Sequence, residues 1–273
     1  MKKTCLANGR PITYYTDGAA KGLPLVLLHG FCEDSSVWDA FLPHFKNIPL
    51  VRIDLPGFGG SGLSPSTGMD SYASAVAAVL HEMEITRCVL VGHSMGGYTA
   101  LAFARRYPEY LAGLGLFHSH PFEDTPDRIE GRKRGIEMLR SGKKDLYVRQ
   151  LFPNLFPAAF VKDHPKMISG LIKQARQLSA EGIIAGLEAM MTRPNHLETL
   201  KSAPYPVLFV LGSEDTLVPP DLGLSAALAP AVSSVHLLPE TGHMGMLEAP
   251  AETAGLVLEF WQFCKEKGSK NPS

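Results

Sequence analysis

The stretch CVLVGHSMGG, residues 88–97, joins a short aliphatic run to a helical pattern that continues to Arg106. It contains the pattern G-x-S-x-G, in which Gly92 and Gly96 lie two residues on either side of Ser94. A serine at a sharp turn from strand to helix is driven toward positive φ, and small residues beside it let the strand and the helix approach closely. The pentapeptide alone is a weak signal, but with a strand before it and a helix after it the stretch predicts a nucleophile at Ser94.

A serine hydroxyl needs a base that takes its proton and an acid that orients the base. Asp215 lies just after the aliphatic run at 207–211, where a carboxylate points toward the ligand edge of a sheet, and Glu214 beside it is the rival acid. His243 lies in a glycine-flanked loop before the last helical pattern. This order along the chain predicts a triad of Ser94, Asp215 and His243.

A second turn at the same sheet edge is predicted by His29-Gly30-Phe31, which follows another aliphatic run. Gly30 allows a tight turn that directs the Phe31 N–H inward, and Met95 contributes an N–H at the start of a helix. Two such donors form an oxyanion hole, in which one donor can stabilise the transition state by roughly 3 to 4 kcal/mol. We therefore expect Phe31 and Met95 to bind the oxyanion, and His29 to be structural.

Short aliphatic runs alternate with longer helical patterns along most of the chain. Asn8-Gly9 separates two alternating segments and predicts a β-hairpin, because both residues tolerate positive φ. Continuous aliphatic runs joined by helical crossovers are typical of parallel strands that are covered on both faces. The pattern predicts an α/β fold with a mostly parallel central sheet flanked by helices. The strand candidates lie at residues 3–7, 11–16, 23–28, 49–53, 88–91, 111–117, 207–211 and 235–238, and the helix candidates at 37–45, 69–83, 95–106 and 247–265.

No strand candidate occurs in residues 119–203, where prolines punctuate helical stretches. An all-helical insertion after the carboxyl end of a strand lies over the edge at which open α/β sheets bind ligands. The expected organisation is therefore a core formed by residues 1–118 and 204–273, interrupted by a helical lid, or cap, at 119–203.

The composition excludes several classes of protein. Apolar residues make up 45% of the 273 residues and charged residues only 19%, so the main state is folded rather than disordered. The formal net charge of -1 offers no attraction for nucleic acid, and no apolar run is long enough to span a membrane. Four widely spaced cysteines suggest neither a disulfide framework nor a zinc site. The basic start at Met1 is not followed by the apolar stretch of a signal peptide, which predicts a cytoplasmic protein.

Taken together, these motifs resemble those of the α/β-hydrolase superfamily over nearly the whole chain. The resemblance implies the fold of that family, with the triad on Ser94, Asp215 and His243 and a structural turn rather than a catalytic acid at Asp54. The matching pieces are His29-Gly30-Phe31, Asp54-Leu55-Pro56-Gly57-Phe58-Gly59-Gly60-Ser61, the turn from Gly92 to Gly97, the acid loop from Gly212 to Pro219, and Gly242-His243.

The identity of the predicted nucleophile, Ser94, narrows the set of enzymes within the superfamily that the chain resembles. Haloalkane dehalogenases and epoxide hydrolases carry an aspartate at the position of Ser94, and dienelactone hydrolases carry a cysteine, so those enzymes are disfavoured. The motif set is most similar to small lidded serine esterases, enol-lactonases and cofactor-free haloperoxidase-like enzymes, and it does not choose among them.

Three residues near the predicted strand ends are candidates for substrate binding. His118 and His120 come after a strand that should end near Ser94, with packing of the loop as the alternative. Cys32 lies beside the oxyanion turn as a candidate pocket thiol, although a small buried filler is the favoured alternative.

The lid also offers charged and apolar side chains to a substrate. It carries 14 Lys and Arg against 10 Asp and Glu, which could guide an anionic substrate, although a charge run on a helix is usually a solvated face. Its apolar residues could wall an acyl pocket, bury the lid against the core, or do both. The basic residues concerned are Arg128, Arg132, Lys133, Arg134, Arg140, Lys143 and Lys144, and the apolar ones are Leu151, Phe152, Leu155, Phe156, Met190 and Met191.

These residues predict a serine hydrolase that cleaves a small or medium carboxylic ester, thioester or lactone through an acyl-enzyme on Ser94, with no metal or organic cofactor. An alternative is an enol-lactonase, a perhydrolase or a C–C bond hydrolase with the same triad. An alternative of another class is a ligand sensor on the same fold that turns over slowly or not at all. The expected partner is a small ester-like molecule rather than nucleic acid, and the expected assembly is a monomer or a homodimer.

Overall fold

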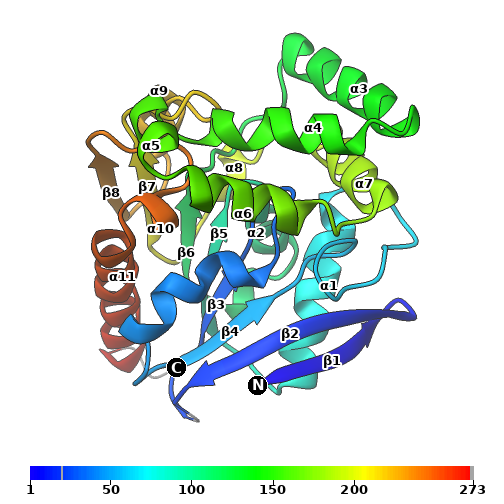
Figure 1. The fold of residues 1–273 in the computed structure, drawn as a ribbon. Coiled ribbons are helices and arrows are strands. Elements are labelled where there is room, and N and C mark those ends of the chain that lie inside the picture. The colour runs from blue at the N-terminus through cyan, green and yellow to red at the C-terminus, as the bar shows by residue number, and fades with distance from the viewer. Residues whose placement is uncertain (20, 271–273) are drawn as a thin grey trace.

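The computed structural model describes residues 1–19 and 21–270, and its centre is an eight-stranded sheet (Figure 1). The strand order is β1-β2-β4-β3-β5-β6-β7-β8. β2 pairs antiparallel with β1 and with β4, whereas the other neighbouring strands are parallel. The predicted α/β fold with a mostly parallel sheet is therefore confirmed. The strands are β1 Lys2–Ala7, β2 Arg10–Gly18, β3 Leu25–Leu28, β4 Pro49–Ile53, β5 Cys88–His93, β6 Leu111–Phe117, β7 Val207–Gly212 and β8 Ser233–Leu238.

The chain opens with the predicted hairpin. Asn8 and Gly9 connect β1 to β2, with φ values of 50° and 75° that suit a two-residue hairpin turn. Ala7 pairs directly with Arg10 across the turn. Because β2 continues to Gly18 and also pairs with β4, the hairpin forms one edge of the sheet.

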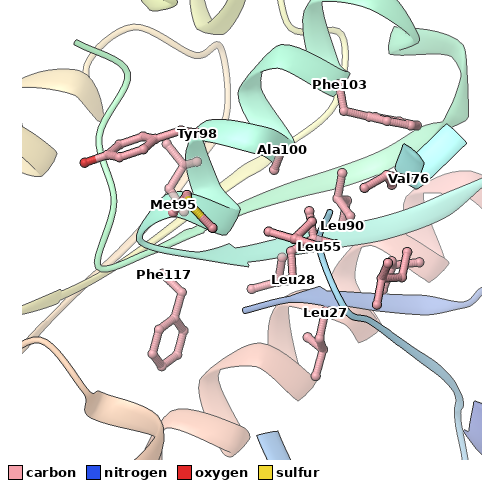
Figure 2. Close-up of a cluster of buried hydrophobic side chains, with 14 of the residues drawn as sticks. Leu27, Leu28, Leu55, Val76, Leu90, Met95, Tyr98, Ala100, Phe103 and Phe117 are labelled. Atoms are coloured by element: carbon pink, nitrogen blue, oxygen red, sulfur yellow. The ribbon is translucent and has the colours of Figure 1, made fainter. Parts of the chain in front are cut away.

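The central strands are buried on both faces, as their continuous apolar runs predict. Every residue of β3 and β5 is buried, and Figure 2 shows α2 on one side of these strands with Leu27 and Phe117 pointing to the other. The predicted run at 23–28 becomes a strand only from Leu25, since Pro24 has no N–H to donate to the ladder. The segments that carry Phe31 and Ser94 follow the carboxyl ends of β3 and β5.

Helices of the core cover both faces of the sheet. α1 and α2 pack against each other, while α11 packs against β6 and the 3-10 helix η1. The predicted helix at 37–45 corresponds to η1, and α9 is absent from the predicted set. These elements are η1 Ser35–His44, α1 Met69–Glu82, α2 Met95–Arg106, η2 Pro108–Tyr110, α9 Pro220–Ala226, α10 Gly245–Glu248 and α11 Pro250–Lys270.

The prediction of one helix at 247–265 is wrong. The structure has two helices, α10 and α11, that are separated at Ala249, whose φ and ψ are -135° and 61°. Pro250 disfavours a helical conformation in the residue before it and lacks the N–H that a continuous helix would need. The short helix α10 can therefore follow the histidine loop in a direction different from that of α11.

Residues 119–203 contain helices and no strand, and we call them the cap segment. Figure 1 shows these helices as a layer across one end of the sheet. Within the layer, α3 packs against α4 and α7. The helices are α3 Pro126–Arg140, α4 Lys144–Leu151, η3 Phe152–Leu155, α5 Ala158–Asp163, α6 Pro165–Ala175, α7 Ala180–Met191 and α8 Leu197–Lys201.

Two further features of the described residues concern the apolarity of the helices and the state of the cysteines. No helix within residues 1–19 and 21–270 is both long and apolar enough to cross a membrane. Cys5, Cys32, Cys88 and Cys264 are free thiols with buried side chains. The cysteines therefore act as apolar packing groups rather than as a framework of cross-links.

Candidate active site

Ser94 lies at the turn between β5 and α2 in a strained backbone conformation. Its φ is 49° and its ψ is -112°, a region that residues with a side chain rarely adopt. A Cβ on Gly92 would lie 2.2 Å from the Gly96 carbonyl oxygen, and a Cβ on Gly96 would lie 2.6 Å from the Leu28 carbonyl oxygen. The two glycines of the G-x-S-x-G pattern are therefore required by close backbone packing around Ser94.

We expect Gly92→Ala to lower the free energy of unfolding by about 3 kcal/mol, because the added methyl group meets backbone atoms that cannot rotate away. The matched control is Gly255→Ala in α11, where a Cβ has no neighbour within 4 Å and should raise that free energy by up to about 1 kcal/mol. Urea unfolding followed by circular dichroism measures both changes. Equal stabilities of Gly92→Ala and the unsubstituted protein would contradict the packing argument.

Asp215 follows β7 and is held by the loop that it belongs to. Its Oδ1 accepts hydrogen bonds from the backbone N–H groups of Leu217 (2.9 Å) and Val218 (2.8 Å). Its Oδ2 accepts a hydrogen bond of 2.7 Å from Nδ1 of His243. The rival acid Glu214 is exposed, whereas Asp215 is only 4% exposed, so the structure joins Asp215 to the histidine.

His243 lies in the loop between β8 and α10 and contacts both the core and the cap segment. Its backbone N–H donates to the Leu155 carbonyl (2.9 Å), and its own carbonyl accepts from Nε2 of His93 (2.9 Å). Since Nδ1–H is directed to Asp215, Nε2 remains as the nitrogen that can accept a proton. His243 and Ser94 line the same cavity, so the structure brings the three predicted residues together.

The buried charges of this group shift two pKa values in opposite directions. Burial by itself would lower the pKa of His243, but the charge and hydrogen bond of Asp215, with Glu33 and Glu248, outweigh burial and raise that pKa above its usual range. Burial by itself would raise the pKa of Asp215, but the charge and hydrogen bond of His243 and the neighbouring His118 lower it. Asp215 is therefore ionised at neutral pH and stabilises the imidazolium form of His243.

The expectation that His118 binds substrate is contradicted by its position. The side chain is fully buried behind Asp215, with Nδ1 3.4 Å from Asp215 Oδ2, and it is not among the cavity-lining residues. Its φ of 48° turns it into the core at the end of β6, where Gly245 leaves room for the ring. Burial lowers the pKa of His118 to about 4, so it is a neutral neighbour of Asp215.

His118, Asp215 and His243 also form a group in the described part of the chain whose ligand atoms all lie within 4.8 Å of one another. Such a group is close enough to hold a metal ion. However, Asp215 Oδ2 and His243 Nδ1 already bind each other in the geometry that a charge-stabilised histidine requires. We therefore assign Asp215 and His243 to the candidate triad, with His118 as their neutral neighbour.

The other two substrate-binding candidates are also buried away from the cavity. Nε2 of His120 lies 3.3 Å from the Tyr98 hydroxyl, and its Nδ1 accepts from the Phe122 N–H. Cys32 is 1% exposed, and burial together with Glu33 raises the pKa of its thiol. Packing of the loop for His120 and a small buried filler for Cys32 are therefore the better interpretations.

The candidate oxyanion donors come from two elements, because Phe31 follows β3 and Met95 begins α2. Phe31 lines the cavity, and Met95 is the first residue of α2, whose initial N–H groups have no acceptor within the helix. A Cβ on Gly30 would lie 2.5 Å from Nδ1 of His93, which explains why the residue before Phe31 has no side chain. The assignment of the oxyanion hole to these two N–H groups stays a prediction.

Glu33 is a residue of the site that the sequence did not single out. It is 6% exposed, lines the cavity, and accepts hydrogen bonds from the Gly30 N–H (2.8 Å) and from His93 Nδ1 (3.2 Å). Through His93, which also contacts the His243 carbonyl, Glu33 connects the oxyanion turn to the histidine loop. No local signal distinguishes it, because an acid just before a helix reads as an ordinary start of that helix.

The cavity between the core and the cap segment has a volume of about 330 Å³. The core supplies polar side chains, such as those of Ser94, Glu33 and His243, as well as apolar ones, and the cap segment supplies apolar side chains and two arginines. Phe152 and Phe156 of the predicted apolar set are buried instead, so the cap segment both packs on the core and walls the cavity. The lining residues are Phe31, Glu33, Ser94, Tyr98, Arg128, Gly131, Arg132, Tyr147, Leu151, Leu155, Leu187, Met190, Thr216, Leu217, Val218 and His243.

Known proteins resemble this chain along most of its length. The family model described as "Alpha/beta hydrolase family" matches residues 25–256. The 2-hydroxy-6-oxononadienedioate/2-hydroxy-6-oxononatrienedioate hydrolase of Burkholderia vietnamiensis is 30% identical over 275 residues, which cover 90% of each chain.

Two solved structures extend this similarity to the fold. A thermophilic esterase of Thermogutta terrifontis, solved with malate bound, superposes with a TM-score of 0.90 at 27% identity and covers 97% of this chain and 99% of its own. The enol-lactonase of Burkholderia xenovorans superposes with a TM-score of 0.87 at 20% identity over 94% and 99% of the two chains, which is a likeness of fold.

Proposed function

The chain belongs to the alpha/beta hydrolase family, and on that premise we propose that it is a serine hydrolase of small or medium carboxylic esters, thioesters or lactones. The observation that carries the proposal is the hydrogen bond of 2.7 Å between His243 and Asp215 in the cavity that also contains the strained Ser94. The esterase from Thermogutta terrifontis, with its similar fold, supports an ester as the substrate.

The proposed reaction is acyl transfer to water in two steps. His243 accepts the proton of the Ser94 hydroxyl while the oxygen attacks the substrate carbonyl, and the same proton then goes to the leaving oxygen or sulfur, which departs as an alcohol or thiol. Water attacks the acyl-enzyme with His243 again as the base, which releases the acid and restores Ser94. Asp215 stabilises the imidazolium, and the N–H groups of Phe31 and Met95 stabilise the oxyanion.

A fluorophosphonate probe tests whether the protein is an enzyme of this type. We expect the probe to form a covalent adduct on Ser94, and mass spectrometry of the digested protein locates it. A panel of p-nitrophenyl esters with acyl chains from acetate to decanoate then defines the preferred length. Absence of any adduct on the folded protein would reject the hydrolase and favour the ligand sensor.

We expect the activity to fall as the pH is lowered, with a midpoint above the usual histidine pKa of about 6.5. His243 must be neutral to act as a base, and its raised pKa means that it keeps its proton up to a higher pH than an isolated histidine. Initial rates of kcat/KM between about pH 4.5 and pH 9 measure the midpoint. A rate that stays constant down to about pH 4.5 would contradict the role of His243.

Carbon–carbon bond hydrolysis is a second candidate, and the similarity to the Burkholderia vietnamiensis hydrolase favours it. The substrate in the name of that relative contains no ester, so its hydrolysis breaks a carbon–carbon bond. Comparison of kcat/KM for a conjugated hydroxy-oxo-dienedioate and for the best p-nitrophenyl ester separates the two functions. A preference for the dienedioate of about 100-fold or more would assign the second function.

We further propose that the cap segment, residues 119–203, is a lid inserted between the core parts 1–118 and 204–273. The hydrogen bond from the His243 N–H to the Leu155 carbonyl supports this division, because it anchors the cap segment over the candidate triad. The cytoplasmic location and the state of monomer or homodimer stay predictions.

A further inference from the structure

Two arginines of the cap segment, Arg128 and Arg132, are half-buried and line the cavity. Arg128 and Arg132 line the cavity together with Ser94 and His243. They are four residues apart on α3, so they lie on the same face of that helix, and Gly131 between them lines the cavity too. Part of the positive charge of the cap segment is therefore directed at the place where a substrate binds.

One acid, Asp124, is shared between Arg132 and a third arginine of the cap segment, Arg193. Asp124 is buried and accepts a hydrogen bond from Arg132 Nε (2.5 Å) and one from Arg193 Nη1 (2.7 Å). One carboxylate thus faces two guanidinium groups, which outweigh the effect of burial and lower the pKa of Asp124. Asp124 stays ionised, so the group of Asp124, Arg132 and Arg193 carries a net charge of one positive unit.

Arg128 adds a second uncompensated charge. Its Nη2 donates a hydrogen bond to the Leu217 backbone carbonyl, and it forms no ion pair with any acid among residues 1–19 and 21–270. A guanidinium has five N–H donors, so most of those on Arg128 remain for a ligand. Glu33, the acid on the cavity wall, is occupied by the Gly30 N–H and by His93.

The positive charge of these arginines also affects the pKa of the nearby His120. Burial, together with the charges of Arg193, Arg128 and Arg132, lowers the pKa of His120 to about 3, against an opposing effect of Asp124. Arg193 also lies 3.9 Å from the centroid of the Tyr98 ring, and Tyr98 lines the cavity. The wall of the cavity opposite the core is thus positively charged.

We propose that Arg128, with Arg132 beside it, binds a carboxylate at the end of the substrate away from the scissile carbonyl. This inference rests on the proposed hydrolysis at Ser94 and specifies its substrate as an ester or lactone with an apolar middle and a carboxylate end, such as a monoester of a dicarboxylic acid. The apolar middle contacts the aliphatic side chains that the cap segment contributes to the cavity wall, which are Leu151, Leu155, Leu187 and Met190.

The chemistry of arginine fits this role. The planar guanidinium is always charged and presents paired donors that match the two oxygens of a carboxylate. A hydrogen bond to a charged group contributes about 1.5 to 3 kcal/mol in proteins, which corresponds to about a 10-fold to 100-fold effect on binding. A neutral substrate of the same shape forgoes this contribution and leaves the charge of Arg128 without a partner.

The test compares two substrates that differ in one terminal group. p-Nitrophenyl adipate carries a free carboxylate at the end of its acyl chain, and p-nitrophenyl adipamate carries an uncharged carboxamide of nearly the same size. We expect kcat/KM for the carboxylate to exceed that for the carboxamide by about 10-fold or more. The same pair with succinate and suberate chains covers the range of distances from Ser94 to Arg128.

The variant Arg128→Gln should reduce this ratio of carboxylate to carboxamide by about 10-fold or more, to near unity. The matched control is Arg134→Gln, which removes the same charge from the exposed side of α3 and should leave the ratio unchanged. Using the ratio within each variant corrects for any loss of folded protein. Equal ratios in Arg128→Gln, Arg134→Gln and the unsubstituted protein would overturn the proposal.

Binding of free adipate gives a readout that does not depend on hydrolysis. In calorimetric titrations, we expect Arg128→Gln to weaken adipate binding by about 10-fold or more relative to Arg134→Gln. Hydrolysis of the carboxamide without any preference for the carboxylate, and adipate binding that is equal in both variants, would reject the carboxylate site while leaving the hydrolase intact. Loss of all hydrolysis and labelling, with Arg128-dependent adipate binding, would reject the hydrolase while supporting the carboxylate site.

Discussion

Replacing Ser94 by alanine is expected to reduce kcat for the best p-nitrophenyl ester by about 10⁴-fold or more. The substitution removes the atom that attacks the carbonyl, whereas the strained turn is built by Gly92 and Gly96 and should keep its shape. The residual rate then comes from the proposed oxyanion donors, which the substitution leaves in place, and from binding of the substrate in the cavity. Steady-state kinetics and loss of the fluorophosphonate adduct measure the effect.

The control for this substitution is Ser169→Ala. Ser169 is exposed on α6, and its hydroxyl donates to the Lys166 carbonyl within the same helix, so its loss should change kcat less than about twofold. Ser94→Ala should also unfold at nearly the same temperature as the unsubstituted protein. Undiminished turnover in Ser94→Ala would show that another group performs the chemistry and would reject the proposed function.

Replacing Asp215 by asparagine is expected to reduce kcat by about 10⁴-fold. The amide keeps the size of the side chain and an oxygen for the N–H groups of Leu217 and Val218. It would however present an NH₂ group or an uncharged oxygen to Nδ1 of His243, which either favours the wrong tautomer or fails to stabilise the imidazolium. The large loss therefore reports on the charge of Asp215 and not on its shape.

Glu214→Gln is the matched control for Asp215→Asn. The two acids are neighbours, but Glu214 is exposed and holds the loop through its backbone N–H, which donates to the Thr241 carbonyl. We expect its kcat to stay within about twofold of that of the unsubstituted protein. A greater loss of kcat in Glu214→Gln than in Asp215→Asn would show that Glu214, rather than Asp215, is the acid of the triad.

Much of the fold could be predicted because it depends on short stretches of sequence. The hairpin requires two adjacent residues with positive φ, which Asn8 and Gly9 provide. The break between α10 and α11 also has a local cause, which is Pro250. The prediction missed it because the apolar pattern continues across the break. Periodicity reports which face of an element is buried, and it is less sensitive to a single residue that interrupts the helix.

The candidate triad could be predicted for a related reason. Ser94, Asp215 and His243 each follow a strand or a turn at the carboxyl edge, so the topology of a parallel sheet brings them near one another without any knowledge of packing. The same argument placed His118 at that edge, but it could not tell that a φ of 48° turns the ring behind Asp215. Sequence position therefore located the residue correctly and its side chain wrongly.

The amino-acid sequence by itself determined the tight turn at Ser94, the order of the candidate triad and the parallel sheet, because these depend on local backbone conformation and on the direction of neighbouring strands. The tertiary structure decided which side chains face the cavity. Glu33 meets His93 from 60 residues away, and His93 meets His243 from 150 residues away. Arg128 faces the cavity because the loop after β7, which carries Leu217, packs against α3. Such contacts depend on how separate elements pack in three dimensions, and no pattern of neighbouring residues encodes them.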